Sequence, residues 1–263
     1  MKIEPLSVEN LREGVFCGHG KAHGEEMYEQ LEVWLDGSRL RGQIARQDNG
    51  DPAGFVLYYP IEEAPLDVTG SGLYMVQCVH VKPEYQREGL GRSLIQSAIA
   101  DARENGASGL AVEGFRKDNK GNPGYIPGAF FQHIGMKEGD SRDKGTLYYY
   151  TFDEKSQPPR YLEPKVRVPK ATSKLRIDLL DCSHCHLAVS RRKVVEAVAA
   201  QAPQDIELVV HDQNTRQAIL DKGMSSGIFL DGRLTYFRGP MTEEDLWNAI
   251  NVARNAREKE IDR

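Results

Sequence analysis

The hydrophobic positions in the first half of the chain follow the helical period in some segments and the strand period in others. Met27, Leu31 and Trp34 recur at helical spacing, and the apolar runs on either side of the turn sequence QDNGDP predict a β-hairpin. This pattern predicts helices at 24–37, 93–104 and 129–134 and strands at 40–46, 53–59, 73–81, 110–113 and 146–152. We therefore expect a first domain of mixed α and β structure over residues 1–153.

A proline-rich stretch follows this domain. The sequence EKSQPPRYLEPKVRVPKATSK contains four prolines and mostly basic charges, and it shows neither a helical nor an alternating pattern. We interpret residues 154–173 as an extended linker stiffened by proline. An arm that packs on one of the domains is an equally weighted alternative.

The hydrophobic pattern then restarts. It predicts strands at 175–180, 206–210, 228–230 and 234–237 and helices at 185–201, 215–222 and 242–256. Asp231 and Gly232 form a strong hairpin turn signal, and Thr242 with Asp245 forms a variant of the N-terminal capping box. A βαβ unit followed by a hairpin and a helix predicts a small three-layer α/β domain over residues 174–263.

The composition excludes several classes of protein. The 263 residues are 40% hydrophobic and 28% charged with a net charge of -5, whereas nucleic-acid-binding proteins usually present a basic face. We expect no membrane partner, because no apolar run approaches the roughly 20 residues needed to cross a bilayer. The N-terminus lacks a signal-peptide pattern, and four scattered cysteines do not make a secreted disulfide framework. These features predict a cytoplasmic protein with reduced thiols.

Gly89 and Gly91 stand one residue apart, between a predicted strand and a predicted helix. At such a junction the free N–H groups of the first helical turn attract an anion, and glycine lets a phosphate approach the backbone. Arg87 and Arg92 flank the turn and can pair with phosphate oxygens. Taken alone, the two glycines are equally compatible with a tight turn that binds no ligand.

The segment Gln86-Arg87-x-Gly89-x-Gly91-Arg92 resembles the acetyl-coenzyme A (acetyl-CoA) signature of the GNAT N-acetyltransferases. LYMVQCVHV resembles the fourth strand of that family, and FFQHIGMKE resembles a later family segment. The resemblance covers roughly residues 1–153 and implies a GNAT fold with a mixed central sheet. It also implies that the loop binds the pyrophosphate and that Val79 and Val81, on the strand before the loop, bind the pantetheine arm. The residues implied to bind acetyl-CoA are Val79, Val81, Gln86, Arg87, Glu88, Gly89, Leu90, Gly91, Arg92 and Phe131.

The resemblance further implies transfer of an acetyl group to an amine, with the N–H of Val79 stabilising the oxyanion. The tyrosine that often protonates the departing thiolate in the family aligns with Phe131, which has no proton to give. Tyr125 is a candidate substitute, and water is another. Glu113 and His80 are candidate general bases, although each side chain alone is more often structural.

Two cysteines of the first domain have open roles. Cys78 lies on the strand expected to contact the thioester, where it is either a small buried side chain or a catalytic thiol. Cys17 precedes the first predicted helix, with His19 and His23 close by in the sequence. Such thiols and imidazoles could bind a soft metal or a thiol-reactive substrate.

The second domain contains Cys182-x-x-Cys185 between a strand and a helix. The helix N-terminus is expected to stabilise the Cys182 thiolate and to make it the more reactive thiol. This placement resembles that of thioredoxin-like and glutaredoxin-like domains, although Ser226 occupies the position of their cis-proline. His184 and His186 leave metal binding open, but no metal site is assigned, and an inert module is a third reading.

The order of the two domains is similar to that of the YoaP-like acetyltransferases, a bacterial group. We therefore expect an N-acetyltransferase that acts on an amine of an unidentified small molecule or peptide and carries an accessory CxxC thiol domain. The alternative is a thiol redox or metal-binding protein whose GNAT domain binds acyl-CoA as a sensor. Phe131 in place of tyrosine favours the alternative, and the phosphate-binding loop favours the enzyme.

Overall fold

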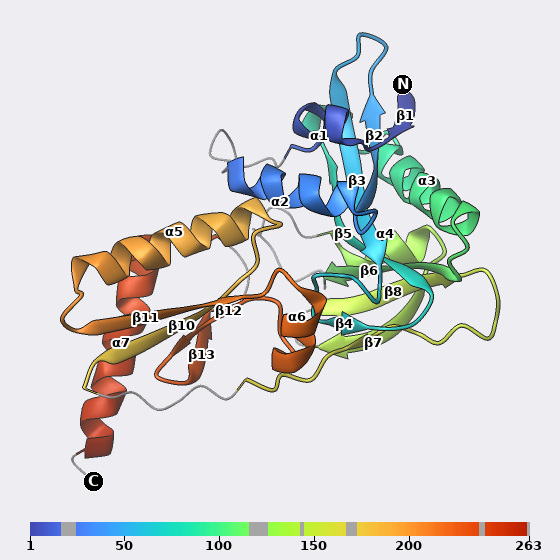
Figure 1. Cartoon of the computed structure of the whole chain (residues 1–263). Helices are drawn as coiled ribbons and strands as arrows, with labels where there is room; N and C mark the ends of the chain where they lie inside the picture. Colours follow the sequence, from blue (N-terminus) through green and yellow to red (C-terminus); the bar gives the residue numbers. More distant parts are fainter. Residues whose placement is uncertain (17–24, 116–125, 143–144, 167–172, 237–239, 262–263) are drawn as a thin grey trace. The chain divides into compact units, whose positions relative to one another are not determined.

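The structure, a computed structural model, describes residues 1–16, 25–115, 126–142, 145–166, 173–236 and 240–261. Its chain divides into two compact units. The first unit comprises Met1–Lys21 and Tyr28–Leu162, and the second comprises Ala22–Met27 and Glu163–Arg263. Figure 1 labels the helices and strands along the chain.

The first unit is built on a seven-stranded sheet in the order β1-β2-β3-β5-β6-β8-β7. Neighbouring strands are antiparallel except for β5 and β6, which are parallel. The predicted mixed central sheet is thereby confirmed. The strands are β1 (Lys2–Pro5), β2 (Arg41–Arg46), β3 (Pro52–Pro60), β5 (Leu73–Val81), β6 (Gly109–Phe115), β7 (Lys137–Arg142) and β8 (Gly145–Thr151).

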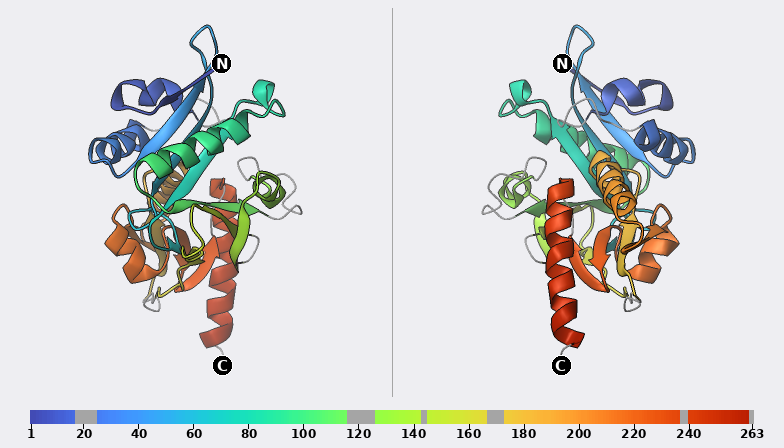
Figure 2. Two further views of the ribbon diagram at one scale, coloured as in Figure 1. Left: turned by 90° about the vertical axis from the view of Figure 1, so that its right-hand side faces the viewer. Right: turned by 90° about the vertical axis from the view of Figure 1, so that its left-hand side faces the viewer.

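Helices cover both faces of this sheet (Figure 2). On one face, α3 (Leu90–Glu104) buries Leu94, Ile95 and Ala98, and together with α4 (Gly128–His133) it encloses one hydrophobic core. On the other face lie α1 (Val8–Gly14) and α2 (Glu25–Asp36). The ring of Trp34 on α2 packs edge-on against Tyr59 of β3, with centroids 5.7 Å apart.

Several short elements of this unit were not predicted. β1 and β7 are largely exposed and polar, so they show no hydrophobic alternation, and α1 has seven residues. β4 (Val68–Thr69) pairs with β9 (Arg160–Tyr161), which lies within the proline-rich stretch. The part of that stretch around β9 therefore packs on the first unit, as the alternative to a free linker proposed.

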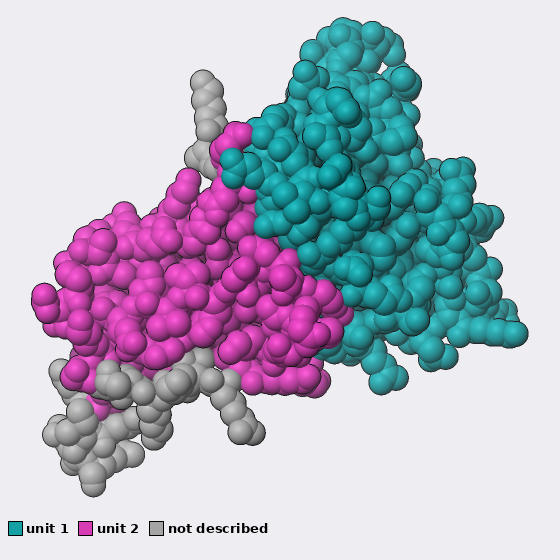
Figure 3. Space-filling view, in the orientation of Figure 1, with its two compact units in different colours: residues 1–21, 28–162 teal, residues 22–27, 163–263 magenta. Residues whose placement is uncertain are grey.

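The second unit contains a four-stranded sheet in the order β11-β10-β12-β13. β10 is parallel to β11 and antiparallel to β12, and β12 and β13 form a hairpin. The bounds are β10 (Leu175–Asp181), α5 (His186–Gln201), β11 (Ile206–Asp212), α6 (Arg216–Lys222), β12 (Gly227–Leu230), β13 (Arg233–Tyr236) and α7 (Glu243–Ile261). Figure 3 colours this unit magenta and the first unit teal.

Local signals account for the second unit. Its main core joins α5 and α7 to the sheet, and a smaller cluster includes Met224, which follows α6. Asp231 and Gly232 both have positive φ, as the predicted hairpin turn requires. The Asp245 N–H donates to Oγ1 of Thr242 at 3.1 Å, and the Thr242 N–H donates to the Asp245 carboxylate at 2.9 Å. The predicted capping box is thereby confirmed.

A charged cluster fixes α3 to the sheet of the first unit. Arg41 on β2 donates two hydrogen bonds of 2.7 Å to the Asp101 carboxylate, and the Tyr58 hydroxyl donates a third at 2.8 Å. Burial by itself would raise the pKa of Asp101, but the hydrogen bonds and the charge of Arg41 outweigh burial and lower this pKa. The cluster therefore stabilises the fold while Asp101 is ionised.

Asp101→Asn should lower the free energy of unfolding by about 2 kcal/mol at neutral pH, because the Arg41 guanidinium loses its charged acceptor. A lowered carboxyl pKa gives stability that is complete above about pH 4 and is lost as the pH falls through the folded-state pKa. Urea melts of both proteins should give a difference in the free energy of unfolding that is constant near neutral pH and becomes smaller in acid. Glu104→Gln, at an exposed position of α3, is the control, and an equal loss there would contradict the assignment.

Candidate functional site

Two neighbouring strands separate in the middle of the first unit's sheet. β5 and β6 pair in parallel from Leu73 opposite Gly109 to Val76 opposite Val112, and their pairing ends there. β5 then continues along β3 as far as Val81, while β6 continues along β8. We call this point the fork. Beyond Val76, no strand among the described residues pairs with the edge of β5 that faces the gap.

A β-bulge lies at the fork. The register between β3 and β5 shifts so that Leu57 is opposite Cys78 and Tyr58 is opposite Val76, which leaves Gln77 as the extra residue. The Tyr59 hydroxyl donates a hydrogen bond to Oε1 of Gln77, on the face of the sheet that α2 covers. Val76 and Val79 both pack against the core below α3, and the bulge lies between them, so Gln77 and Cys78 share the opposite face.

The remaining residues of β5 divide between the two faces. The ring of His80 stacks on Phe55 with centroids 5.9 Å apart, and it also packs against Phe16. Val79 and Val81 pack on the opposite side, against the core below α3. All of these β5 residues are partly exposed, whereas Leu73 to Val76 are buried. The exposed half of β5 is thus the part that lies beyond the fork.

The glycine loop has the backbone of an anion site. Arg87 has φ +67 and Gly89, the residue before α3, has φ +84, so two left-handed residues precede the helix. The first intrahelical hydrogen bond runs from the Ser93 N–H to the Gly89 carbonyl at 3.1 Å. In the described structure the N–H groups of Leu90, Gly91 and Arg92 therefore have no acceptor within the helix, and no side chain caps them.

The steric environment of the glycines fits a ligand. A Cβ at Gly89 would meet no atom within 4 Å, and a Cβ at Gly91 would lie in ordinary contact, 3.5 Å from Phe130. Internal packing therefore does not require glycine at position 91. Open space beside exposed helical N–H groups is the arrangement that binds phosphate groups. The loop thus fits the pyrophosphate of the predicted cofactor.

Several predicted cofactor residues have structural contacts of their own. Nε2 of Gln86 donates to the Val81 carbonyl at 2.9 Å, which ties the loop to the end of β5, and Arg92 donates to the His133 carbonyl at 3.3 Å. Arg87, Glu88 and Gly89 are exposed, whereas Leu90 belongs to the core. Their binding roles stay predictions.

Phe131 does not fit its predicted place among the cofactor contacts. It is fully buried and lies against Tyr148 at a centroid distance of 5.7 Å, because α4 turns this side chain into the core. Its neighbour Phe130 is partly exposed and lies beside Gly91. The family motif matched to the sequence gives position 131 as the cofactor contact. The packing of α4 instead places position 130 beside the loop.

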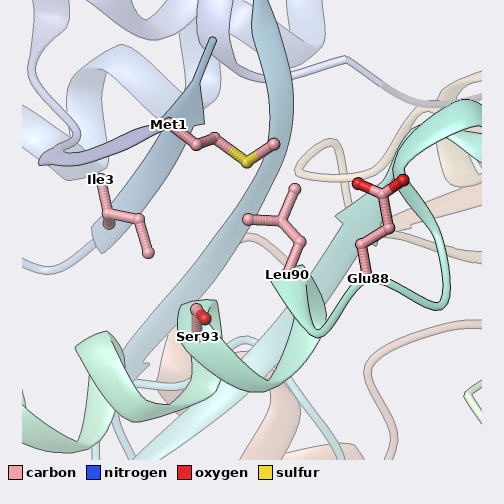
Figure 4. A pocket seen from close by; sticks show the side chains of 5 residues that line it. All are labelled: Met1, Ile3, Glu88, Leu90 and Ser93. Atoms are coloured by element: carbon pink, nitrogen blue, oxygen red, sulfur yellow. The ribbon is translucent and has the colours of Figure 1, made fainter. Parts of the chain in front are cut away.

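A shallow hollow lies beside the loop, between β1 and the start of α3 (Figure 4). Its walls come from Met1 and Ile3 on one side and Glu88, Leu90 and Ser93 on the other. Apolar walls and an acidic side chain do not suit a phosphate group. We therefore place the anion at the helical N–H groups and not in this hollow.

The last pair between β5 and β6 is Val76 opposite Val112. Gln77 is the next residue on β5, and Glu113 is the next residue on β6. Leu110 and Val112 point into the core below α3, so Glu113 points to the opposite face, which it shares with Cys78. Its Oε1 accepts a hydrogen bond of 2.9 Å from the hydroxyl of Tyr161. The sequence did not indicate Tyr161, since it lies in the proline-rich stretch. The other predicted site residues Cys17, His19, His23 and Tyr125 lie outside the described residues.

The second unit presents its cysteines differently from the sequence prediction. Helix α5 begins at His186, and Cys185 is its N-cap residue and is partly exposed. Cys182 is 1% exposed, and its Sγ is hydrogen-bonded to Nδ1 of His184. The expectation that Cys182 is the more reactive thiol was therefore wrong in its premise. Access favours Cys185, which is also the residue at the helix N-terminus.

The loop between the two cysteines is tied to the start of α6. The Ser183 N–H donates to Oδ1 of Asn214 at 2.8 Å. Asp181 is buried beside the pair, and burial raises its pKa although Arg192 lies 3.0 Å away. Among the described residues no peptide bond is cis, and none of their His, Cys, Asp and Glu side chains form a group of three suited to a metal ion.

The first unit can be compared with known proteins. Residues 8–125 match the model of the acetyltransferase (GNAT) family. The first unit carries a GNAT acetyltransferase domain. The match supports the predicted enzyme class, an acetyl-CoA-dependent N-acetyltransferase. No described helix is long and apolar enough to cross a membrane.

Solved structures are similar to the GNAT domain. A GNAT family acetyltransferase from Brucella melitensis in complex with acetyl-CoA is 19% identical, with 60% of this chain and 90% of that chain covered and a TM-score of 0.40. The PaiA N-acetyltransferase from Thermoplasma acidophilum, with coenzyme A, is 18% identical, with 58% and 100% covered and a TM-score of 0.39. The ribosomal-protein-S18-alanine N-acetyltransferase from Escherichia coli is 16% identical, with 59% and 96% covered and a TM-score of 0.39. No curated protein matches the chain.

Substitutions at Gly91 test the loop of the GNAT domain. Gly91→Asp should weaken acetyl-CoA binding at least about tenfold, because its carboxylate repels the pyrophosphate. Gly91→Ala should weaken binding less, since its Cβ fits the internal packing. Calorimetric titration measures affinity, and circular dichroism checks the fold. Gln96→Asp, at an exposed position further along α3, is the control for added charge, and a Gly91→Asp protein with full affinity would refute the assignment.

Proposed function

We propose that the protein transfers the acetyl group of acetyl-CoA to an amine of a small molecule or peptide at the fork. The observation that carries this proposal is the continuity of β5 with the loop. The chain passes from the fork through Val81 and the 3-10 turn Pro83–Tyr85 directly to the anion site at the start of α3. A ligand with its pyrophosphate on the loop can extend along the free edge of β5 for about 13 Å, the length of four strand residues.

The reaction at the fork needs few groups. The amine nitrogen attacks the thioester carbonyl, an N–H donor stabilises the oxyanion, and the C–S bond then breaks to release the thiolate. We assign the oxyanion contact to the Val79 N–H and the removal of the amine proton to Glu113. Tyr125 or water protonates the thiolate. Cys78 shares the face of Glu113, so an acyl relay through its thiol is a second role within the same site.

We further propose that the second unit is a thioredoxin-like thiol domain. Its βαβ unit, antiparallel hairpin and closing helix support this assignment, as does a CxxC pair between β10 and α5. Ser226 at the cis-proline position argues against ordinary disulfide exchange with a docked protein. A cytoplasmic location with reduced thiols, and a YoaP-like affiliation, belong to this proposal.

A sensor that binds acyl-CoA without fast transfer is the second candidate function. The buried phenyl ring of Phe131 favours it, because this position supplies no acid for the thiolate. Steady-state release of coenzyme A with a panel of amines separates the two functions. Saturable acetyl-CoA binding without turnover on any amine would favour the sensor.

Glu113→Gln should lower kcat about 100-fold, because the amide cannot take the amine proton. The affinity for acetyl-CoA should stay unchanged, since Glu113 is assigned no contact with the cofactor. Thiol release with a reactive amine measures turnover, and titration with acetyl-CoA measures affinity. Glu154→Gln, an exposed position, is the matched control. Full turnover by Glu113→Gln would exclude this residue as the base.

The thiol domain predicts an order of modification. Cys185 should react with iodoacetamide well before Cys182, because Cys182 is buried and bonded to His184. Mass spectrometry of wild type, Cys182→Ser and Cys185→Ser measures both rates. A redox pair should also form a disulfide that dithiothreitol reverses, with a midpoint of roughly -270 to -200 mV.

The other readings of the thiol pair give different results. Metal binding predicts about one equivalent of a thiophilic ion in the purified protein and alkylation only after chelation. Metal-free protein that forms no disulfide under oxidant would support an inert module. Faster alkylation of Cys182 than of Cys185 would contradict the assignment based on access.

A further inference from the structure

Tyr161 joins the fork from outside the segment that matches the GNAT family model. It lies on β9, 48 positions after Glu113, and its hydroxyl donates a hydrogen bond of 2.9 Å to Oε1 of Glu113. The side chain of Tyr161 is buried. A hydrogen bond to a carboxylate is stronger than one between neutral groups, particularly where water is excluded. The contact therefore orients the carboxylate that we propose as the base.

Three separate contacts hold the tyrosine in place. β9 pairs with β4, where Tyr161 is opposite Val68. The Tyr161 N–H donates to Oδ2 of Asp140 at 3.0 Å, and the guanidinium of Arg142 lies over its ring, 4.5 Å from the centroid. Arg142 is in turn fixed by an ion pair of 2.9 Å with Asp67, which is fully buried. The position of the hydroxyl is thus determined before any substrate binds.

Gly145 on β8 makes room for the hydrogen-bonded pair. A Cβ at this position would lie 2.6 Å from Oε1 of Glu113 and 2.7 Å from the hydroxyl of Tyr161, closer than real contacts allow. The φ of Gly145 is not in the left-handed region, so its backbone conformation does not require glycine. The absence of a side chain at position 145 is explained by the space that the carboxylate and the phenol occupy.

We infer that Tyr161 is a positioning residue for acetyl transfer, because its hydroxyl fixes Oε1 of Glu113 and thereby sets the orientation of the proposed base. This inference rests on the proposed function of Glu113. It makes the segment after β8 part of the catalytic unit, so a GNAT domain truncated before β9 lacks one of its groups. Orientation of a base affects the chemical step and not the binding of acetyl-CoA.

Tyr161→Phe in the full-length protein tests the inference, since it removes one oxygen atom and preserves the ring. We expect kcat to fall about tenfold, with the KM for acetyl-CoA and the melting temperature nearly unchanged. Tyr150→Phe, on the exposed part of β8, is the matched control and should keep full kcat. Unchanged kcat in a folded Tyr161→Phe protein would overturn the inference.

A double-substitution cycle separates positioning from a general structural role. If Tyr161 acts through Glu113, then Tyr161→Phe should have little further effect on kcat in the Glu113→Gln background. Multiplicative losses, or a loss that accompanies a lower melting temperature and a raised KM, would show that the tyrosine is merely structural and would overturn the inference. Failure of the proposed function gives a different result, because Glu113→Gln alone would then keep full activity.

Discussion

The first unit depends on the separation of β5 from β6 after Val76 and Val112. Backbone N–H and C=O groups within a fold need partners, and both strands meet this requirement on their outer edges, β5 along β3 and β6 along β8. The bulge at Gln77 strengthens the local twist at the same point. The strands can therefore separate without weakening the sheet, and we propose that the edge of β5 that faces the gap accepts an extended ligand by strand-like hydrogen bonds.

Phenol groups hold the polar side chains that the fork brings together. Tyr59 donates to Gln77 on one strand, and Tyr161 donates to Glu113 on the other. A tyrosine ring has few rotatable bonds, so a packed ring fixes its hydroxyl at a small cost in conformational entropy. Such preorganisation places an amide and a carboxylate on the face of Cys78 before a substrate arrives. Tyr161 lies at the end of the first unit, whose last residue is Leu162.

The sequence predicted the parts of this site that depend on local structure. The central strands are continuous apolar runs, and Gly89 marks the start of α3 because its left-handed backbone favours glycine. β9 and β4 have two residues each and pair over a separation of about 90 positions, so no local period indicates them. The contact between Glu113 and Tyr161 follows from this distant pairing. The bulge at Gln77 is a matter of backbone register, which the residue type does not specify.

In the second unit, too, local sequence patterns predict the elements but not the contacts that depend on tertiary packing. All of the helices and strands described in it were predicted, since each is a regular run that ends at a turn or cap such as Asp231-Gly232. The placement of its two thiols was not, because the first residue of α5 and the burial of Cys182 depend on tertiary packing. A helix N-terminus can stabilise a thiolate within its first turn, but a buried sulfur must still meet its reagent. We therefore expect access to decide which thiol of this pair reacts first, because the Cys182 sulfur is buried and hydrogen-bonded to Nδ1 of His184.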